Sequence, residues 1–248
     1  SEEMLGLLTG SGHEIVDSEE EAEAIVINTC CFIHDAKEES VNTILEMAEY
    51  KKTGKCKALV VTGCMAQRYK EEITQEIPEV DAVLGTTSYG DIVKALNEVQ
   101  AGHVFQEFRD INELPEDSGR RVLTTGGHFG YLKIAEGCDK HCTYCIIPSL
   151  RGSFRSVPEE RLLAQAEYMA SQGVKELILV AQETTVYGTD LYGRKTLHIL
   201  LKKLCQIRGI RWIRVLYCYP EEIYDELIQV MKEEKKICNY LDLPIQHA

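Results

Sequence analysis

Residues 130–145 read GYLKIAEGCDKHCTYC, a short apolar segment followed at once by three cysteines spaced C-x3-C-x2-C. The segment 130–136 has the length and composition of a β-strand, which would place the cysteines on a loop at its carboxyl end. In βα barrels the residues that carry the chemistry lie at this end of the strands. The stretch therefore predicts a strand of a parallel sheet and, directly after it, a functional loop.

The rest of the C-terminal half alternates between strand and helix patterns. Apolar segments typical of buried strands occupy residues 176–183, 210–219 and 239–248, with amphipathic segments between them. Strands that alternate with helices in this way indicate a parallel sheet. Three βα units and a fourth strand make the first half of a βα barrel or of an open α/β sheet. We therefore expect the remainder of the barrel to lie beyond this sequence.

A helix is expected after the cysteine loop, with signals at both of its ends. Ser156 and Glu159 have the spacing of a capping box, in which the serine hydroxyl accepts a backbone N–H of the first helical turn. Pro158 falls within that turn, and Gly173 follows the last one. These residues predict where the helix begins and ends.

The N-terminal half shows the same alternation. Strand patterns at 23–33, 57–64 and 81–87 alternate with helix patterns at 36–52, 66–77 and 89–100. We predict a doubly wound, flavodoxin-like parallel sheet over residues 1–100, covered by helices on both faces and lacking its first strand. Gly, Pro and charged residues interrupt the periodicity over 101–128, which predicts a linker, and the half barrel follows over 129–248.

Composition narrows the class of protein. The chain has 248 residues, of which 44% are hydrophobic, enough for one or two domains. Its ten cysteines are about 4% of the residues, below the roughly 8–10% of a disulfide scaffold. No apolar run approaches the roughly 18 residues that a transmembrane helix needs. We therefore expect a cytoplasmic protein with reduced thiols and no membrane partner.

The net charge of −13 is unevenly distributed. Residues 1–100 contain twenty acidic and eight basic side chains, a net charge of −12, whereas residues 129–248 contain fifteen acidic and sixteen basic ones, a net charge of +1. Many of these charges could simply lie on solvated faces. The alternative is a preference for a basic partner, which makes nucleic acid the less favoured ligand because an acidic surface repels phosphate groups.

Three thiols within eight residues indicate a metal centre. Cys138, Cys142 and Cys145 can hold a 4Fe-4S cluster by three of its irons and leave the fourth iron open to a small molecule. A zinc site with His141 as the fourth ligand is an alternative, although zinc sites more often pair two C-x2-C motifs separated by a dozen or more residues. Buried thiols without a metal are a third reading.

The loop and its surroundings resemble a known family. The C-x3-C-x2-C spacing with Tyr144 before the last cysteine resembles the radical S-adenosylmethionine superfamily, and residues 136–156 resemble its methylthiotransferases. The N-terminal segments INTCCFIHDA (27–36) and VTGCMAQRY (61–69) are similar to two cysteine motifs of that family. The resemblance thus covers the whole chain.

This resemblance implies a radical-generating 4Fe-4S cluster on Cys138, Cys142 and Cys145, with S-adenosylmethionine on the open iron. Gln182 and Glu183, at the end of the second strand of the half barrel, would contact the methionyl amine, unless they form only a polar loop. The backbone of Tyr144 would touch the adenine edge, although a packing aromatic would look the same in sequence. No residue is assigned as catalytic.

A second 4Fe-4S cluster is implied for the N-terminal half, where Cys30 and Cys64 close two neighbouring strands. In the family a third cysteine from an earlier strand completes this set, and that strand is expected to be missing here, which leaves the second site incomplete. Cys31 is a poor substitute because adjacent residues of a strand point to opposite faces. The four isolated cysteines are expected to be small core residues, namely Cys56, Cys205, Cys218 and Cys238.

Two branches of the family modify different substrates. The segments QETTVYGTDLYG (182–193), VLYCYPEE (215–222) and YLDLPIQHA (240–248) resemble the branch that methylthiolates the β-carbon of an aspartate in a ribosomal protein of the small subunit. The other branch modifies an adenosine in tRNA, and a non-catalytic metal-cluster module is a further alternative. The family's C-terminal β-barrel domain has no counterpart here, so activity of this chain alone is in doubt, and the electron donor is unknown.

Overall fold

The computed structural model describes residues 1–116, 119 and 121–245, so Gln246 and His247, at the end of the last predicted strand, lie outside the described residues. The chain forms two compact units. Unit 1 comprises Ser1–Val122 and Cys142–Arg151, and unit 2 comprises Leu123–His141 and Gly152–Ala248.

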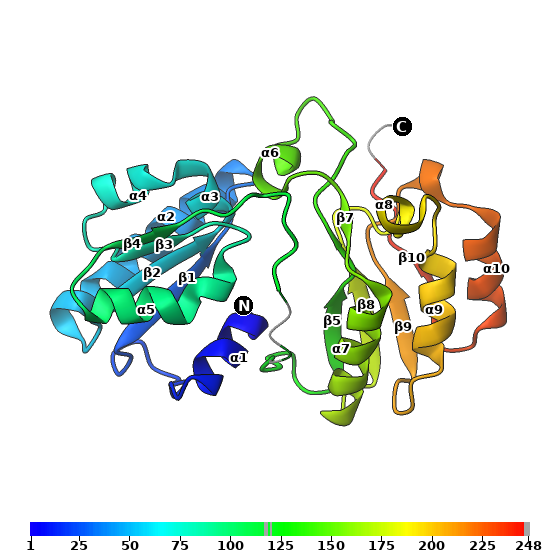
Figure 1. Cartoon of the computed structure of the whole chain (residues 1–248), viewed down its shortest axis with the longest axis horizontal. Coiled ribbons are helices and arrows are strands. Elements are labelled where there is room, and N and C mark those ends of the chain that lie inside the picture. Colours follow the sequence, from blue (N-terminus) through cyan, green and yellow to red (C-terminus); the bar gives the residue numbers. More distant parts are fainter. Residues whose placement is uncertain (117–118, 120, 246–248) are drawn as a thin grey trace. The chain divides into compact units, whose positions relative to one another are not determined.

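Unit 1 is built on a four-stranded parallel sheet in the order β1-β2-β3-β4. The strands are β1 (Ala24–Thr29), β2 (Ala58–Gly63), β3 (Ala82–Leu84) and β4 (Phe105–Glu107) (Figure 1). Every residue of β2 is buried, as expected for a central strand covered on both faces. The stretch 101–128 was predicted as a linker, but β4 lies within it and pairs with β3. Its three half-buried residues are too few to produce a strand pattern in the sequence.

Helices cover both faces of this sheet. On one face Leu59 and Val61 pack against α2 (His34–Thr53), α3 (Cys64–Tyr69) and α4 (Glu71–Glu76). On the other face Ala58 and Val60 pack against α1 (Glu2–Gly10) and α5 (Ile92–Gln100), which follows the short helix η1 (Tyr89–Asp91). Alternate residues of β2 thus lie in two separate cores, because successive side chains of a strand point to opposite faces.

The helical pattern at 66–77 is divided between α3 and α4. Lys70 separates the two helices and has a left-handed backbone, with φ 44°. A residue in this conformation cannot continue a right-handed helix. The amphipathic pattern continues through Lys70 and therefore predicted one helix where the structure has two short ones.

Unit 2 contains a second four-stranded parallel sheet, in the order β10-β9-β8-β5. Its strands are β5 (Phe129–Lys133), β8 (Glu176–Val180), β9 (Trp212–Val215) and β10 (Ile237–Leu241). The helices that contact them are α7 (Glu159–Ser171), α9 (Leu197–Cys205) and α10 (Asp225–Glu233) (Figure 1). Two short helices, α8 (Thr189–Tyr192) and η2 (Pro220–Glu222), occupy the connections. The predicted α/β class, with a parallel sheet followed by half a βα barrel, is confirmed.

The predicted capping box at the start of α7 is wrong. The helix begins after Pro158 and has no side-chain cap. Ser156 is fully buried; its hydroxyl donates to Asp190, and its oxygen accepts the N–H of Gly188 and not one from the helix. Asp190 and Gly188 therefore orient this hydroxyl within the unit, and its bond to the carboxylate is of the stronger, charge-assisted kind.

No helix among the described residues is both long enough and apolar enough to cross a lipid bilayer.

Candidate functional site

The loop that begins with Cys138 is closed at its base within unit 2. The short strands β6 (Ala135–Glu136) and β7 (Arg155–Ser156) pair antiparallel on either side of it. Next to them the N–H of Cys138 donates to the carbonyl oxygen of Gly152 at 3.1 Å. The N–H of Phe154 donates to Oδ1 of Asp139 at 3.0 Å. These contacts fix both ends of the loop relative to one another.

Gly137 allows this closure. Its φ of 79° is in the left-handed region, and a Cβ atom on it would collide with the carbonyl oxygens of Ser153 and Gly152. Both observations require a residue without a side chain. The glycine that precedes the first cysteine is therefore part of the loop's geometry.

The three cysteines of the motif differ in exposure and in the unit to which they belong. Cys138 is buried in unit 2, whereas Cys142 and Cys145 are half-buried in unit 1. The N–H of Cys145 donates to the carbonyl oxygen of Cys142 at 2.9 Å, so these two lie on one tight turn. Tyr144 between them is 65% exposed. Over the described residues, no three His, Cys, Asp or Glu side chains gather closely enough to hold one metal ion, and the ligand roles of the cysteines stay predictions.

Glu183 lies just beyond the end of β8 and is almost fully buried. Its Oε1 accepts the N–H of Thr185 at 3.0 Å and the N–H of Tyr219 at 3.5 Å, and the hydroxyl of Thr185 also donates to it. Its Oε2 is buried without a hydrogen-bond partner in the described structure. Burial raises the pKa of this carboxyl above its ordinary value.

Gln182 is oriented by a second buried carboxylate. Its Nε2 donates to Oε1 of Glu136 at 3.1 Å, and Nζ of Lys133 donates to Oε2 of Glu136 at 2.6 Å. The amide oxygen of Gln182 is buried and, like Oε2 of Glu183, has no partner among the described residues. Buried polar atoms are nearly always hydrogen-bonded, so each of these two oxygens indicates a position where a donor would bind.

The contact to Glu136 was not predicted from the sequence. Glu136 precedes the Gly-Cys of the motif and is only 4% exposed. Its position could have indicated this contact. Glu136 continues a buried strand, and a buried carboxylate must have partners.

In unit 1, Cys30 directly follows β1 and Cys64 directly follows β2. The parallel register pairs Thr29 with Gly63, so the two cysteines lie at the same edge of the sheet, as predicted. Gly63 has φ 97°, and a Cβ atom there would collide with the carbonyl oxygen of Thr29. The two strand ends approach this closely only because residue 63 has no side chain.

The adjacent cysteines Cys30 and Cys31 face different surroundings. Cys30 is exposed, and its N–H donates to the hydroxyl of Ser40 at 3.0 Å. Cys31 is 2% exposed and packs in the core beneath α2. Burial, and then the nearby Cys64, raise the pKa of the Cys31 thiol. The expected opposite orientation of the two side chains agrees with this difference.

Cys64 also meets an arginine from the segment that follows the cysteine loop. Arg151 ends the short helix α6 (Ile147–Arg151), which belongs to unit 1. Its Nε and Nη2 atoms lie 3.3 Å and 3.2 Å from Sγ of Cys64. This contact was not predicted, because 87 residues separate the two side chains along the chain.

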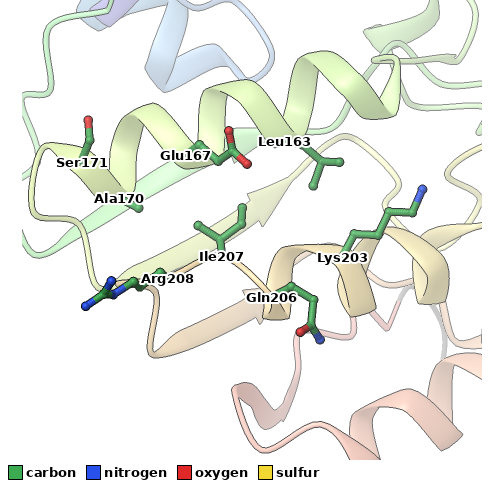
Figure 2. A pocket seen from close by; sticks show the side chains of 8 residues that line it. All are labelled: Leu163, Glu167, Ala170, Ser171, Lys203, Gln206, Ile207 and Arg208. Carbon is green, nitrogen blue, oxygen red and sulfur yellow. The ribbon is translucent and has the colours of Figure 1, made fainter.

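A hollow on the surface of unit 2 does not include these residues. It has a volume of about 540 Å³ and is bordered by α7, α9 and the turn after α9 (Figure 2). Its lining includes Leu163, Glu167, Lys203 and Arg208, and none of the predicted site residues is part of it.

Comparison with known proteins decides the family. Residues 132–248 match the family model described as the Radical SAM superfamily, and residues 1–85 match the one described as Uncharacterized protein family UPF0004. The whole chain is 65% identical to the ribosomal protein uS12 methylthiotransferase RimO of Lachnoclostridium phytofermentans. The chain belongs to the methylthiotransferase family of the radical S-adenosylmethionine superfamily.

Other methylthiotransferases of the same name are also similar over the full chain. The identity is 51% for the one from Clostridium botulinum (strain Eklund 17B) and 50% for the one from Clostridioides difficile. The chain spans 56%, 55% and 56% of the lengths of these three relatives, that is, little more than half.

Solved structures show the same fold. The radical S-adenosylmethionine methyltransferase TsrM from Kitasatospora setae, with cobalamin and a 4Fe-4S cluster bound, matches 90% of this chain and 48% of its own at a TM-score of 0.60 and 11% identity. The cobalamin-dependent radical enzyme OxsB matches 91% of this chain and 36% of its own at a TM-score of 0.54 and 16% identity. At such low identity these matches concern the fold alone.

Proposed function

We propose that the protein containing this chain transfers a methylthio group to the β-carbon of an aspartate in ribosomal protein uS12. The observation that carries this proposal is the three-thiol loop at the carboxyl end of the first half-barrel strand. It occurs in a chain that is 65% identical, over all 248 residues, to a curated ribosomal-protein methylthiotransferase.

Cys138, Cys142 and Cys145 would hold a 4Fe-4S cluster by three irons, because thiolates are the usual protein ligands of such clusters. The donor set fits, since three thiols leave one iron for the amino and carboxylate groups of S-adenosylmethionine. When bound, the cluster and S-adenosylmethionine supply a carbon radical that can remove hydrogen from an unactivated C–H bond. No side-chain acid or base of ordinary pKa could do this.

The buried oxygens beyond β8 fit the amino group of S-adenosylmethionine. Oε2 of Glu183 and the amide oxygen of Gln182 are both acceptors without donors in the described structure, and an ammonium group supplies only donors. Glu136 would hold the Gln182 amide so that its oxygen is presented to this group. Tyr144 is proposed to contact the adenine edge through its backbone.

Cys30 and Cys64 would hold part of a second 4Fe-4S cluster, which in the family carries the sulfur to be transferred. Their shared sheet edge supports this role, because ligands of doubly wound sheets gather at the carboxyl ends of the strands. As in the family, a cysteine from an earlier strand would complete the set.

The charge of the N-terminal half supports a protein substrate. Its net charge of −12 over residues 1–100 favours a basic polypeptide and disfavours tRNA. The cytoplasmic location and the need for an external electron donor remain predictions.

The function is tested in two steps. Mass spectrometry of ribosomal proteins and tRNA from a strain that lacks the gene should show loss of the methylthio group from uS12 and an unchanged tRNA. Loss from tRNA alone would establish the tRNA branch instead.

Anaerobic reconstitution of the full-length protein, with spectra recorded before and after addition of S-adenosylmethionine, should show a cluster signal that shifts. A signal that does not respond to S-adenosylmethionine would indicate a closed, non-catalytic metal site.

A further inference from the structure

We propose that Arg151 is a positioning residue for the second cluster, acting through the sulfur of Cys64. This inference rests on the proposed function of Cys64 as a cluster ligand. Two nitrogen atoms of the guanidinium group, Nε and Nη2, approach the same sulfur at 3.3 Å and 3.2 Å. A planar guanidinium that directs two N–H groups at one atom holds that atom in a defined direction as well as attracting its charge.

The arginine is held at this place by packing. Leu150, the preceding residue, is 4% exposed and lies in the core of unit 1 together with Ile146 and Met65. The hydroxyl of Thr86 donates to the carbonyl oxygen of Leu150 at 3.0 Å. Helix α6 thus has apolar and polar anchors of its own in unit 1. The approach of Arg151 to Cys64 does not depend on an ion pair alone.

The segment that contains Arg151 gives the contact a functional context. Residues 142–151 belong to unit 1 and also include Cys142 and Cys145, the predicted ligands of the radical-generating cluster. One short segment therefore supplies ligands to one predicted cluster and an N–H donor pair to a ligand of the other.

The positive charge of Arg151 should affect the reduction potential of the second cluster. Hydrogen bonds and positive charge near the sulfur ligands stabilise the reduced, more negative state of an iron–sulfur cluster and raise its reduction potential. Replacing Arg151 by Gln removes the charge and should lower the potential of the second cluster. Replacing it by Lys keeps the charge but loses the planar guanidinium, so the potential should lie between those of the parent and of Arg151→Gln.

The experiment isolates the second cluster. In the full-length protein, Cys138, Cys142 and Cys145 are replaced by Ala, and the remaining cluster is loaded anaerobically and titrated with a reductant while its electron paramagnetic resonance signal is recorded. Arg151→Gln and Arg151→Lys are compared in this background. Arg208→Gln, an exposed arginine of unit 2, is the matched control and should leave the potential unchanged.

The outcomes separate this inference from the function on which it rests. A lower potential for Arg151→Gln, with Arg151→Lys in between, supports the role of Arg151. Equal potentials for Arg151→Gln and the parent overturn it and leave the proposed function intact. If Arg151→Gln fails to fold or to bind the cluster, Arg151→Lys decides, because an unchanged potential in that variant also overturns the proposal. Failure of the parent itself to bind a cluster overturns the proposed role of Cys64 and this inference together.

Discussion

Asp190 accepts two hydrogen bonds from Ser156, one from the backbone N–H at 2.8 Å and one from the hydroxyl at 2.6 Å. The same serine oxygen accepts the N–H of Gly188 at 2.9 Å. Ser156 is the last residue of β7, which closes the base of the cysteine loop. Asp190 therefore connects that base to the segment that follows the predicted cofactor residues.

Asp190→Ala should destabilise the chain by about 2 kcal/mol, because it leaves two donors of the fully buried Ser156 without an acceptor. Asp190→Asn keeps one acceptor oxygen and should lose less. Chemical denaturation of the two variants and the parent measures both values. Equal stability of Asp190→Ala and the parent would show that water replaces the carboxylate at this position.

Glu183→Gln should stabilise the chain in the absence of cofactor, and the gain should grow with pH. Burial raises the pKa of Glu183 above its ordinary value of 4.5, so the folded state binds the proton more tightly than the unfolded state. The carboxyl therefore has little effect on stability well below pH 4.5 and becomes destabilising as the pH rises through its raised pKa. Thermal unfolding of both proteins between pH 4 and pH 8 tests this sign. A constant difference in unfolding temperature would contradict it.

The same substitution should weaken binding of S-adenosylmethionine to the reconstituted full-length protein by about tenfold or more, because a charge-assisted hydrogen bond contributes roughly 1.5–3 kcal/mol. Equilibrium dialysis with labelled S-adenosylmethionine measures the change. Glu167→Gln, in the hollow bordered by α7 and α9 (Figure 2), is the control and should bind like the parent. Unchanged affinity in Glu183→Gln would remove Glu183 from the cofactor site.

Cys30 and Cys205 should react with alkylating reagents at very different rates in the chain without metal. Cys30 is exposed, whereas Cys205 is 5% exposed and burial raises its pKa to about 11. At pH 8 a thiol with that pKa is almost entirely protonated, and the thiolate is the reactive form. Peptide mass spectrometry after brief treatment with iodoacetamide should find Cys30 modified, and Cys205 modified only after unfolding. Similar labelling of the two would mean that α9 opens readily.

Lys70→Gly should be more stable than Lys70→Ala by about 1 kcal/mol, since only glycine adopts the left-handed backbone at this position without a steric penalty. Both variants lose the contact of the Lys70 ammonium with the Phe108 ring, so their difference reports the backbone alone. Urea denaturation of the pair gives the value. If the alanine variant were the more stable, α3 and α4 would be joined into one helix in solution.

Periodicity along the chain was sufficient to predict most of the fold. The run ALVVTG predicted a buried strand because all six of its residues suit a pleated surface covered on both sides, and β2 is such a strand. Lys70 and β4 show the limit of this reasoning. A single left-handed residue leaves no trace in an amphipathic pattern, and a three-residue strand is too short to form one.

The chemical groups of the predicted site follow from the order of residues, because the spacing of three thiols and the succession of strands and helices are properties of the chain alone. Which of these groups meet depends on folding. Glu136 and Gln182 are 46 residues apart, and Cys64 and Arg151 are 87 apart. Such contacts depend on strand register and on packing between distant segments. The Ser156 hydroxyl likewise contacts Asp190 and Gly188, which folding brings close to it, and not the helix that follows it in the sequence.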